Sequence, residues 1–516
     1  MTRYTFVVLR KLRHHFLLIL FVLLPLHALF VTVGTRLIEG YGHAPMPLLA
    51  IWKEVLIAFI FLVGIVELAM ADWKSVLIMI KGGRWKFRLD APTWCILGLL
   101  AVAIILFING APSSLTQFVF GFKYDFIPLI FFLLLAWLPW DQDFLEKRMY
   151  PAVFIIGGIV AAYGILTFFL PQGFFTTLGY SDAHSIYAPG SSLSAFQHIS
   201  NTGIRRIQST FSGPNQFGLW LLIPWSVGLC VMLSEGALYR PSSSPSLRSG
   251  FAQDDTARRR RNIPFLLLIA FALLLTFSRS AWIAAFVITV IAISVNIHGK
   301  RRMHILMTLF SIVILAIITL MATMPSLIER SISNRHHIER VREGIVTMIQ
   351  NPLGFGLGSA GPASNRVSDT CLYFDEGADT SWAKDRSDLC LFIGRTQVQP
   401  TIDQKECHCP LLPENWYIQI GLELGILGFA LFLALCFIIL KRLSIINVSP
   451  AFLAFLGISI ASLFLHAWED SAVAYTVWGL VGVLLSSSES VATDESRGLS
   501  THSSSLRSDS FARGKP

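Results

Sequence analysis

The sequence predicts an all-α polytopic membrane protein, with about twelve transmembrane helices and one large external loop. Hydrophobic residues make up 54% of the 516 residues and charged residues only 14%, whereas soluble domains carry about 25% charged residues. Apolar stretches long enough, or nearly long enough, to cross a bilayer recur along the whole chain. This composition excludes a soluble enzyme with one added anchor.

The apolar stretches divide the chain into domains. Residues 1–323 hold the first nine and residues 415–486 the last three, on either side of a long loop. The first stretch follows a basic segment, as in a signal peptide, but no small-residue cleavage site follows, so we interpret it as a retained helix. The predicted spans are 16–33, 48–71, 93–109, 124–140, 152–170, 215–233, 263–278, 281–297, 303–323, 415–440, 450–467 and 471–486.

The distribution of positive charge predicts the orientation in the membrane. A formal net charge of +9 would suggest nucleic acid as the partner of a soluble protein. Here 26 of the 41 Lys and Arg residues fall in segments assigned to the cytoplasm if the N-terminus is inside. This bias follows the positive-inside rule and predicts that both termini are cytoplasmic, with no nucleic-acid partner. The short external segments hold only Arg36, Lys123, Arg205, Arg206 and Arg279.

Two Ser-rich cytoplasmic segments, about 240–262 and 487–516, are expected to be disordered because neither can bury a core. The external loop, 324–414, is the only substantial segment outside the membrane. It opens with an amphipathic helical pattern between Ile328 and Met348, which stops at Asn351-Pro352.

Four of the seven cysteines lie in this loop, and we expect two disulfides in an oxidising compartment. Three connectivities are open, although a direct Cys407–Cys409 bond would be strained. The alternatives are free thiols or a metal site at Cys407-His408-Cys409, which lacks the usual zinc spacing. The four cysteines are Cys371, Cys390, Cys407 and Cys409.

Three charged motifs lie at the external membrane boundary, where charge is costly and suggests function. In the first, Arg205 and Arg206 precede Pro214-Asn215. A helix N-terminus beside two guanidinium groups can hold a phosphate. The alternative is a pair of interfacial arginines that reach toward lipid headgroups.

The second motif places Arg279 in a turn between two spans. It is either a functional cation or a structural cap of helix C-termini. The third begins at Glu414-Asn415, where the loop returns to the membrane. Glu414 is a candidate general base if burial raises its pKa, or a helix cap. Glu423 lies deeper and is expected to be a structural partner, for example of an Arg.

Together the motifs resemble the O-antigen ligase and O-antigen polymerase superfamily of integral membrane glycosyltransferases. The resemblance covers roughly 200–440 and rests on four strings in order. They are R-I-Q-S-T-F-S-G-P-N-Q-F-G from Arg206, L-T-F-S-R-S-A-W from Leu275, N-P-x-G-x-G-x-G from Asn351, and E-N-W-Y-I-Q-I-G-L-E-L-G-I-L-G from Glu414.

The resemblance implies a GT-C-like fold and transfer of a glycan from a polyprenyl-diphosphate carrier to an acceptor hydroxyl. The reaction would occur on the external face of the cytoplasmic (inner) membrane, with inversion and with no cofactor or metal. Its partners would be the lipid-linked glycan donor, a glycan or lipid acceptor, and membrane lipids. Arg206 and Arg279 match the diphosphate-binding positions, and Arg205 is a third candidate.

Ligases of this family commonly carry His where this chain has Glu414. The base is therefore Glu414 or a loop histidine such as His337, and polymerase-like chain extension is the alternative activity. A polytopic transporter or flippase is a further alternative, although no two related halves are visible in the sequence. Asn215, Arg340, Arg342 and Asn415 are candidates for substrate binding or for support of the loop.

Overall fold

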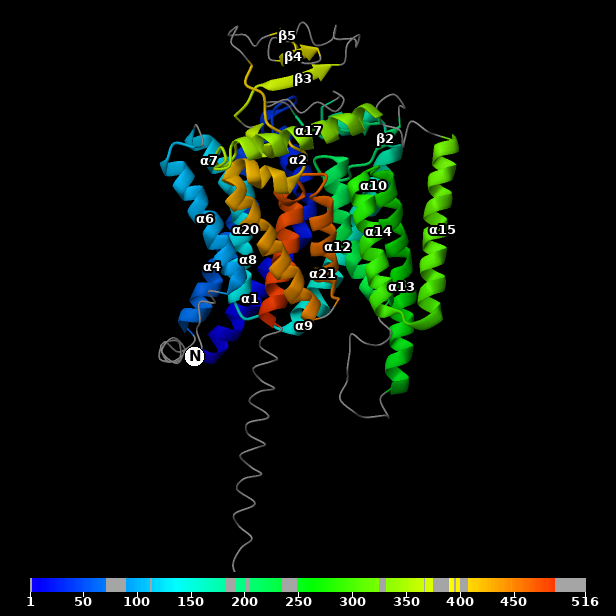
Figure 1. The fold of residues 1–516 in the computed structure, drawn as a ribbon. Helices are drawn as coiled ribbons and strands as arrows, with labels where there is room; N and C mark the ends of the chain where they lie inside the picture. Colours follow the sequence, from blue (N-terminus) through cyan, green and yellow to red (C-terminus); the bar gives the residue numbers. More distant parts are fainter. Residues whose placement is uncertain are drawn as a thin grey trace, which may run out of the picture.

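In the computed structural model the chain forms a bundle of roughly parallel and antiparallel helices, crossed at one end by α17 (Ser331–Gln350) (Figure 1). A small sheet lies beyond α17 at that end, and the N-terminus lies at the opposite end. The structure describes residues 2–70, 90–111, 114–181, 192–199, 204–233, 248–323, 331–365, 367–374, 389–393, 396–399, 407–446 and 448–487.

The first half of the bundle contains both long and short helices. A 3-10 turn with Pro25 separates the first two helices, and α7 and α8 are joined by a π-helical turn at 122–126. The elements are α1 (Thr2–Leu23), α2 (His27–Glu39), α3 (Pro47–Ala50), α4 (Trp52–Met70), α6 (Ala91–Ile108), α7 (Leu115–Gly121), α8 (Ile127–Trp137), α9 (Gln142–Phe144), α10 (Tyr150–Phe169) and α11 (Gln172–Thr177).

The second half contains longer helices, and α12 packs against α10, α13, α14 and α21. Two small sheets complete the fold. The helices are α12 (Pro214–Leu233), α13 (Arg248–Leu275), α14 (Arg279–Asn296), α15 (Gly299–Thr323), α18 (Gly361–Ser364), α20 (Trp416–Ile446), α21 (Pro450–Ala461) and a last helix, Ser471–Ser487.

By length and apolar composition, seven helices within the described residues can cross a membrane, which fits an integral, multi-pass membrane protein. Three shorter apolar helices, at 262–275, 450–461 and 471–487, lie among them. The seven are Val7–Glu39, Ala91–Ile108, Leu115–Trp137, Leu145–Phe169, Pro214–Leu233, Arg279–Asn296 and Trp416–Ile446.

Three predicted boundaries differ from the structure. The span predicted at 16–33 lies within a longer helical segment that begins with α1. Arg13 therefore lies buried inside α1 and not in a cytoplasmic loop. The helix predicted to continue to residue 467 ends at Ala461. Helix α13 begins at Arg248, within the segment predicted to be disordered, where an Ala-Arg run favours helix. The predicted tail lies outside the described residues, except for Ser487.

The core of the bundle is aromatic. Trp220, Trp468 and Trp478 are almost completely buried, and the ring centroids of Trp468 and Trp478 are 5.1 Å apart. By contrast, α15 exposes Ile312 and Leu315, as a helix surrounded by lipid would.

The two sheets lie at the α17 end. Strands β1 (Gln197–His198) and β2 (Arg205–Arg206) form an antiparallel pair. In the second sheet β4 (Leu389–Ile393) lies between β3 (Thr370–Phe374), which is parallel to it, and β5 (Thr396–Gln399), which is antiparallel. Disulfides join Cys371 to Cys409 and Cys390 to Cys407.

The first and last helices meet at the end of the bundle opposite α17. Arg13 Nη2 donates to the carbonyl oxygen of Pro139 (2.7 Å), and Ser486 Oγ donates to that of Leu138 (2.6 Å). The beginning of α1 and the end of the last helix therefore lie on the same side of the bundle.

Candidate active site

Each of the three charged motifs leads into the N-terminus of a long helix: α12 at Pro214, α14 at Arg279 and α20 at Trp416. Helices α12 and α14 both pack on α21, and the C-terminal end of α21 reaches the third motif. There the Trp416 amide donates to the carbonyl oxygen of Ser462 (2.9 Å). The structure therefore gathers the three motifs at the α17 end, where helix N-termini favour anions.

Each motif also contains one residue with an unusual backbone conformation. Ser209, Phe277 and Glu414 have φ angles of 53°, 49° and 51°, and they are the non-glycine residues with positive φ within the described part of the chain. Such a conformation costs on the order of 1–3 kcal/mol and persists only where surrounding contacts impose it. For Ser209 the contact is a 2.7 Å hydrogen bond from Oγ to the Val160 carbonyl oxygen.

Arg206 connects the first two motifs. Its Nε donates to the carbonyl oxygen of Thr276 (2.9 Å), in the turn before Arg279. Its Nη2 donates to Oδ1 of Asn215 (2.7 Å), at the start of α12. The guanidinium is thus held in place between two helix N-termini, and Asn215 orients it.

The Arg205 side chain does not contact the partners of Arg206 and lies among other groups. Neighbouring side chains of a strand point to opposite faces. Arg205 Nη1 donates to the carbonyl oxygens of Leu170 (2.8 Å) and Phe168 (3.2 Å), and its guanidinium lies 3.6 Å from the centroid of the Phe196 ring. Arg205 therefore satisfies the carbonyls at the C-terminal end of α10.

Arg279 is the first residue of α14 and is half-buried. Ser and Thr side chains shape the turn that presents it. The Ser278 amide donates to Oγ1 of Thr276 (3.2 Å), and the hydroxyls of Ser278 and Ser280 lie 3.3 Å apart.

Glu414 lies between two residues of α17. One carboxylate oxygen pairs with Nη1 of Arg340 and the other with Nδ1 of His337. Burial raises the pKa of Glu414, but the hydrogen bond from His337 and the charge of Arg340 outweigh burial and hold this pKa below its usual value. His337 and Arg340 are three residues apart, so they share one face of the helix. Arg342 is exposed elsewhere on α17 and does not join them.

Asn415 has a structural position at the start of α20. Its Oδ1 accepts from the amide of Ile418 (3.1 Å), as the side chain of a helix N-cap does, and its Nδ2 donates to the carbonyl oxygen of Leu463 (2.9 Å).

Glu423 accepts hydrogen bonds from backbone amides, not from the arginine that the sequence suggested. Its Oε1 accepts from the amides of Gly358 (3.0 Å) and Ala360 (3.3 Å) in the Gly-rich loop. Helix α20 is interrupted at Gly425, and the carbonyl oxygens of Leu422 and Glu423 accept from Phe355 (2.8 Å) and Gly356 (2.9 Å). The loop thus fills a break in the helix.

A second polar group, formed by Gln419, His466 and Glu469, lies close to Glu414, and no sequence motif pointed to it. His466 Nδ1 contacts Gln419 Oε1, and Gln419 Nε2 donates to Glu469 Oε2 (3.0 Å). Burial lowers the pKa of His466 to about 4, although the charge of Glu414 acts in the opposite direction.

Another charged cluster lies outside this assembly. Glu54 contacts Lys53 (3.5 Å) and Lys123 (3.4 Å). In the described part of the chain, no three His, Cys, Asp or Glu side chains form a group that could hold a metal ion.

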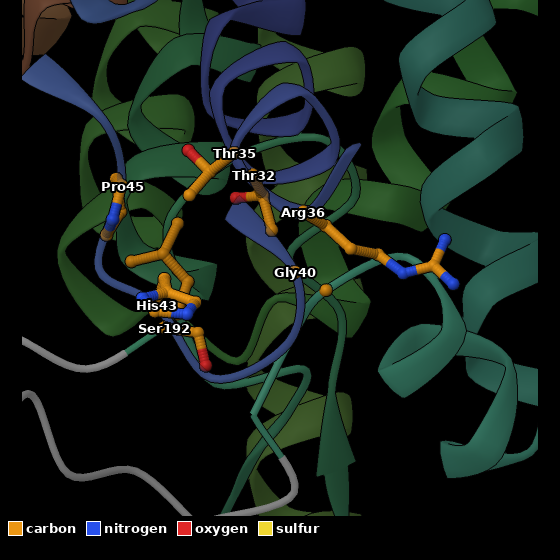
Figure 2. Close-up of a pocket in the computed structure, with 9 residues that line it drawn as sticks. Thr32, Thr35, Arg36, Gly40, His43, Pro45 and Ser192 are labelled. Atoms are coloured by element: carbon orange, nitrogen blue, oxygen red, sulfur yellow. The ribbon is translucent and has the colours of Figure 1, made fainter. Parts of the chain in front are cut away.

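A small pocket lies between α2, the turn that follows it and residues 192–193. Figure 2 shows Thr32, Thr35 and His43 around it, while the guanidinium of Arg36 points away. This pocket includes none of the motif residues.

The comparisons with known proteins agree with the motifs. Residues 264–381 match the family model described as O-antigen ligase. The matched stretch includes the second motif, α17 and the Gly-rich loop. No curated protein matches the chain. Residues 264–381 are therefore similar to the O-antigen ligase family, and the resemblance inferred from the motifs is confirmed over this part of the chain.

Proposed function

We propose that this protein transfers a glycan from a polyprenyl-diphosphate carrier to an acceptor hydroxyl on the external face of the cytoplasmic membrane. The observation that carries the proposal is the pairing of Glu414 with His337 and Arg340 at the end of the bundle that also holds Arg206 and Arg279. In this proposal a proton acceptor and an anion-binding site, at the same end of the bundle, take part in one reaction.

Arg206 and Arg279 are the proposed diphosphate ligands. Each lies at the start of a helix, or bonds to the turn before it, so guanidinium charge and helix N-terminus act on the same anion. Guanidinium groups hold phosphate oxygens in a bidentate geometry and stabilise the charge that develops on the leaving diphosphate. Such a site needs no metal.

His337 is the proposed general base, and Glu414 is its orienting partner. A lowered pKa makes the Glu414 carboxylate a weak base. Its contact with Nδ1 leaves Nε2 of His337 for the acceptor, and the His337 side chain is 40% exposed. This is the logic of a carboxylate–histidine pair, in which the acid fixes the tautomer and stabilises the imidazolium.

The proposed step is a single displacement. The acceptor oxygen forms a bond to the anomeric carbon while the bond from that carbon to the diphosphate oxygen breaks. The proton of the acceptor hydroxyl moves to His337, and the diphosphate leaves as an anion held by the arginines. Attack opposite the leaving group inverts the anomeric configuration.

The proposed membrane arrangement has twelve spans and a GT-C-like fold, with the α17 end outside. The beginning of α1 and the end of the last helix lie at the other end, so both termini would be cytoplasmic. This orientation agrees with the positive-inside bias. Helix α21 has 12 residues and is about 18 Å long, so this proposed span is shorter than the hydrocarbon core of a bilayer.

The test is a liposome assay with purified protein and an undecaprenyl-diphosphate glycan. Arg279→Ala should abolish consumption of the donor, and His337→Gln should reduce kcat by about 10²–10⁴-fold. Glu414→Gln should also reduce kcat, because the orienting carboxylate is lost. Arg342→Ala, on the same helix but outside the pairing, is the matched control. Normal turnover by Arg279→Ala would disprove the diphosphate site.

The products separate the two activities of the family. Transfer to a different acceptor indicates a ligase, whereas longer chains on the carrier indicate a polymerase. The Glu at position 414, where ligases commonly have His, is the feature that favours the polymerase alternative. A transporter would move the donor without consuming it.

A further inference from the structure

The three-stranded sheet beyond α17 has two different faces. Leu372, Phe374, Leu389 and Leu391 pack together on one face. Side chains alternate along a strand, so Cys371, Tyr373, Cys390 and Phe392 occupy the other face. The pairing register places Cys371 beside Cys390 and Tyr373 beside Phe392.

Tyr373 and Phe392 form a stacked pair on the disulfide face. Their ring centroids are 4.9 Å apart with an angle of 24° between planes. Tyr373 is 56% exposed, and Phe392 is half-buried beside it. An exposed aromatic ring held on a rigid support is typical of recognition surfaces.

Covalent bonds fix this pair relative to Glu414. Cys371, two residues before Tyr373, is bonded to Cys409, and five residues further along the chain is Glu414. The segment between them is also held in place, because the Gly361 amide donates to the carbonyl oxygen of Leu411 (2.8 Å).

The aromatic pair also lies next to the catalytic face of α17. The Tyr373 hydroxyl interacts electrostatically with Arg340 and Glu343. Arg340 is the residue that pairs with Glu414. An acceptor that approaches His337 from the side of the sheet would meet Tyr373.

We propose that Tyr373, at the edge of the sheet and supported by the stacked Phe392 ring, forms the binding platform for the acceptor glycan. The faces of aromatic rings carry negative charge density that attracts the C–H groups of a pyranose ring. The Cys371–Cys409 disulfide ties the platform to the segment that carries Glu414, the partner of His337, so a sugar stacked on it would present a neighbouring hydroxyl to the base. This inference rests on the proposed glycan transfer.

The first experiment measures binding without turnover. The purified protein in nanodiscs is applied to a printed array of bacterial surface oligosaccharides, and wild type is compared with Tyr373→Leu and Phe392→Leu. Leucine keeps apolar bulk but removes the flat ring, so binding of each recognised glycan should fall about tenfold. Tyr373→Phe keeps the ring and should bind like wild type.

The matched control is Val398→Ala, an exposed apolar position on β5 of the same sheet. Mass spectrometry of each variant checks that both disulfides are intact. Unchanged binding by Tyr373→Leu and Phe392→Leu with intact disulfides would overturn the platform, as would the absence of any glycan bound by wild type. Binding that depends on both rings, without donor consumption in liposomes, would support the platform and refute the proposed transfer.

The second experiment uses the transfer assay. Tyr373→Leu should raise the acceptor KM about tenfold and leave the donor KM unchanged. An effect confined to kcat would contradict a binding role.

Discussion

A 2.9 Å hydrogen bond from Arg206 Nε to the carbonyl oxygen of Thr276, beside a bond from the Ile207 amide to the carbonyl oxygen of Leu275 (3.2 Å), joins two motifs that are about 70 residues apart in the sequence. Thr276 opens the turn that ends at Arg279, so the position of Arg206 is coupled to that of Arg279. The proposed diphosphate site therefore depends on the backbone of this turn as well as on the two side chains.

Arg206→Lys tests this coupling. Lysine keeps the charge but has no planar fork, so it cannot hold Thr276, Asn215 and a phosphate together. We expect kcat/KM for the lipid-linked donor to fall about 10²-fold, comparable to the loss of one preorganised donor.

The neighbouring residue provides the control. Arg205→Lys weakens the contacts to the end of α10 and should lower the thermal midpoint, with turnover per folded molecule unchanged. Equal loss of turnover in both variants would show that the two arginines act together, against the geometry described above.

The pH dependence of stability should reveal His466. Its pKa is lowered to about 4 in the folded protein, below the usual value near 6.5, because burial disfavours the charged form. Between these values the unfolded chain binds the proton and the folded protein does not, so the histidine makes stability fall as pH decreases from 6.5 to 4. Asp470 acts in the opposite direction, since burial raises its pKa to about 6.

His466→Gln isolates the contribution of the histidine, because all other groups titrate in both proteins. The difference in thermal midpoint between wild type and variant should change between pH 7 and pH 4.5, in favour of the variant at low pH. A difference that is constant with pH would mean that His466 is not buried in its neutral form.

The sequence predicted the order of the helices and the positions of the three motifs, because apolar length and charged turns are local properties. It also placed the end of the amphipathic helix correctly, since Pro352 cannot continue a helix that ends at Gln350. The Gly-rich segment and Glu423 were both noticed, but their contact is long-range. A buried carboxylate can accept hydrogen bonds from backbone amides as well as from an arginine, and the tertiary structure determines which of these partners it has.

Long-range contacts also determine which of the predicted site residues come together. Arg205 and Arg206 are identical in type and adjacent, and the pleat of a two-residue strand separates their roles. His337 was a candidate only as a loop histidine, because its partner Glu414 is 77 positions away. The pairing depends on how α17 crosses the bundle, which no local pattern encodes.

Gly358→Ala tests how closely the Gly-rich loop packs against α7. Gly358 has a φ of +75°, and a Cβ there would lie 2.2 Å from the carbonyl oxygen of Gln117. The contact is with backbone and cannot be relieved by a rotamer change. We expect a clear loss of thermal stability and, because the amide of Gly358 bonds to Glu423, a loss of donor turnover.

Gly40→Ala is the control for this variant, since Gly40 has a φ of +98° with no atom within 4 Å of its Cβ position. It carries a conformational penalty without the clash, on the order of 1–3 kcal/mol, because φ +98° with ψ −160° is a region that residues with a Cβ rarely adopt. A Gly358→Ala variant no less stable than Gly40→Ala in detergent would contradict close packing of the loop.

The opposite end of the bundle allows a test of how burial changes the strength of an ion pair. Arg13 Nε and Glu67 Oε2 are 2.8 Å apart and completely buried, and Lys147 Nζ and Asp143 Oδ2 are also 2.8 Å apart but exposed. Arg13→Met leaves a buried carboxylate with Arg10 at 3.3 Å as its remaining partner, so we expect a loss of about 3 kcal/mol in the free energy of unfolding. Lys147→Met should cost no more than about 0.5 kcal/mol, because water screens and replaces the exposed pair.

Adding Glu67→Leu to Arg13→Met should recover part of the loss, since an apolar pair of similar volume removes the uncompensated charge. If Arg13→Met and Lys147→Met lowered the free energy of unfolding equally in denaturant titrations, water would have to reach the Arg13–Glu67 pair. The packing of α1 against α4 would then not exclude water at this end.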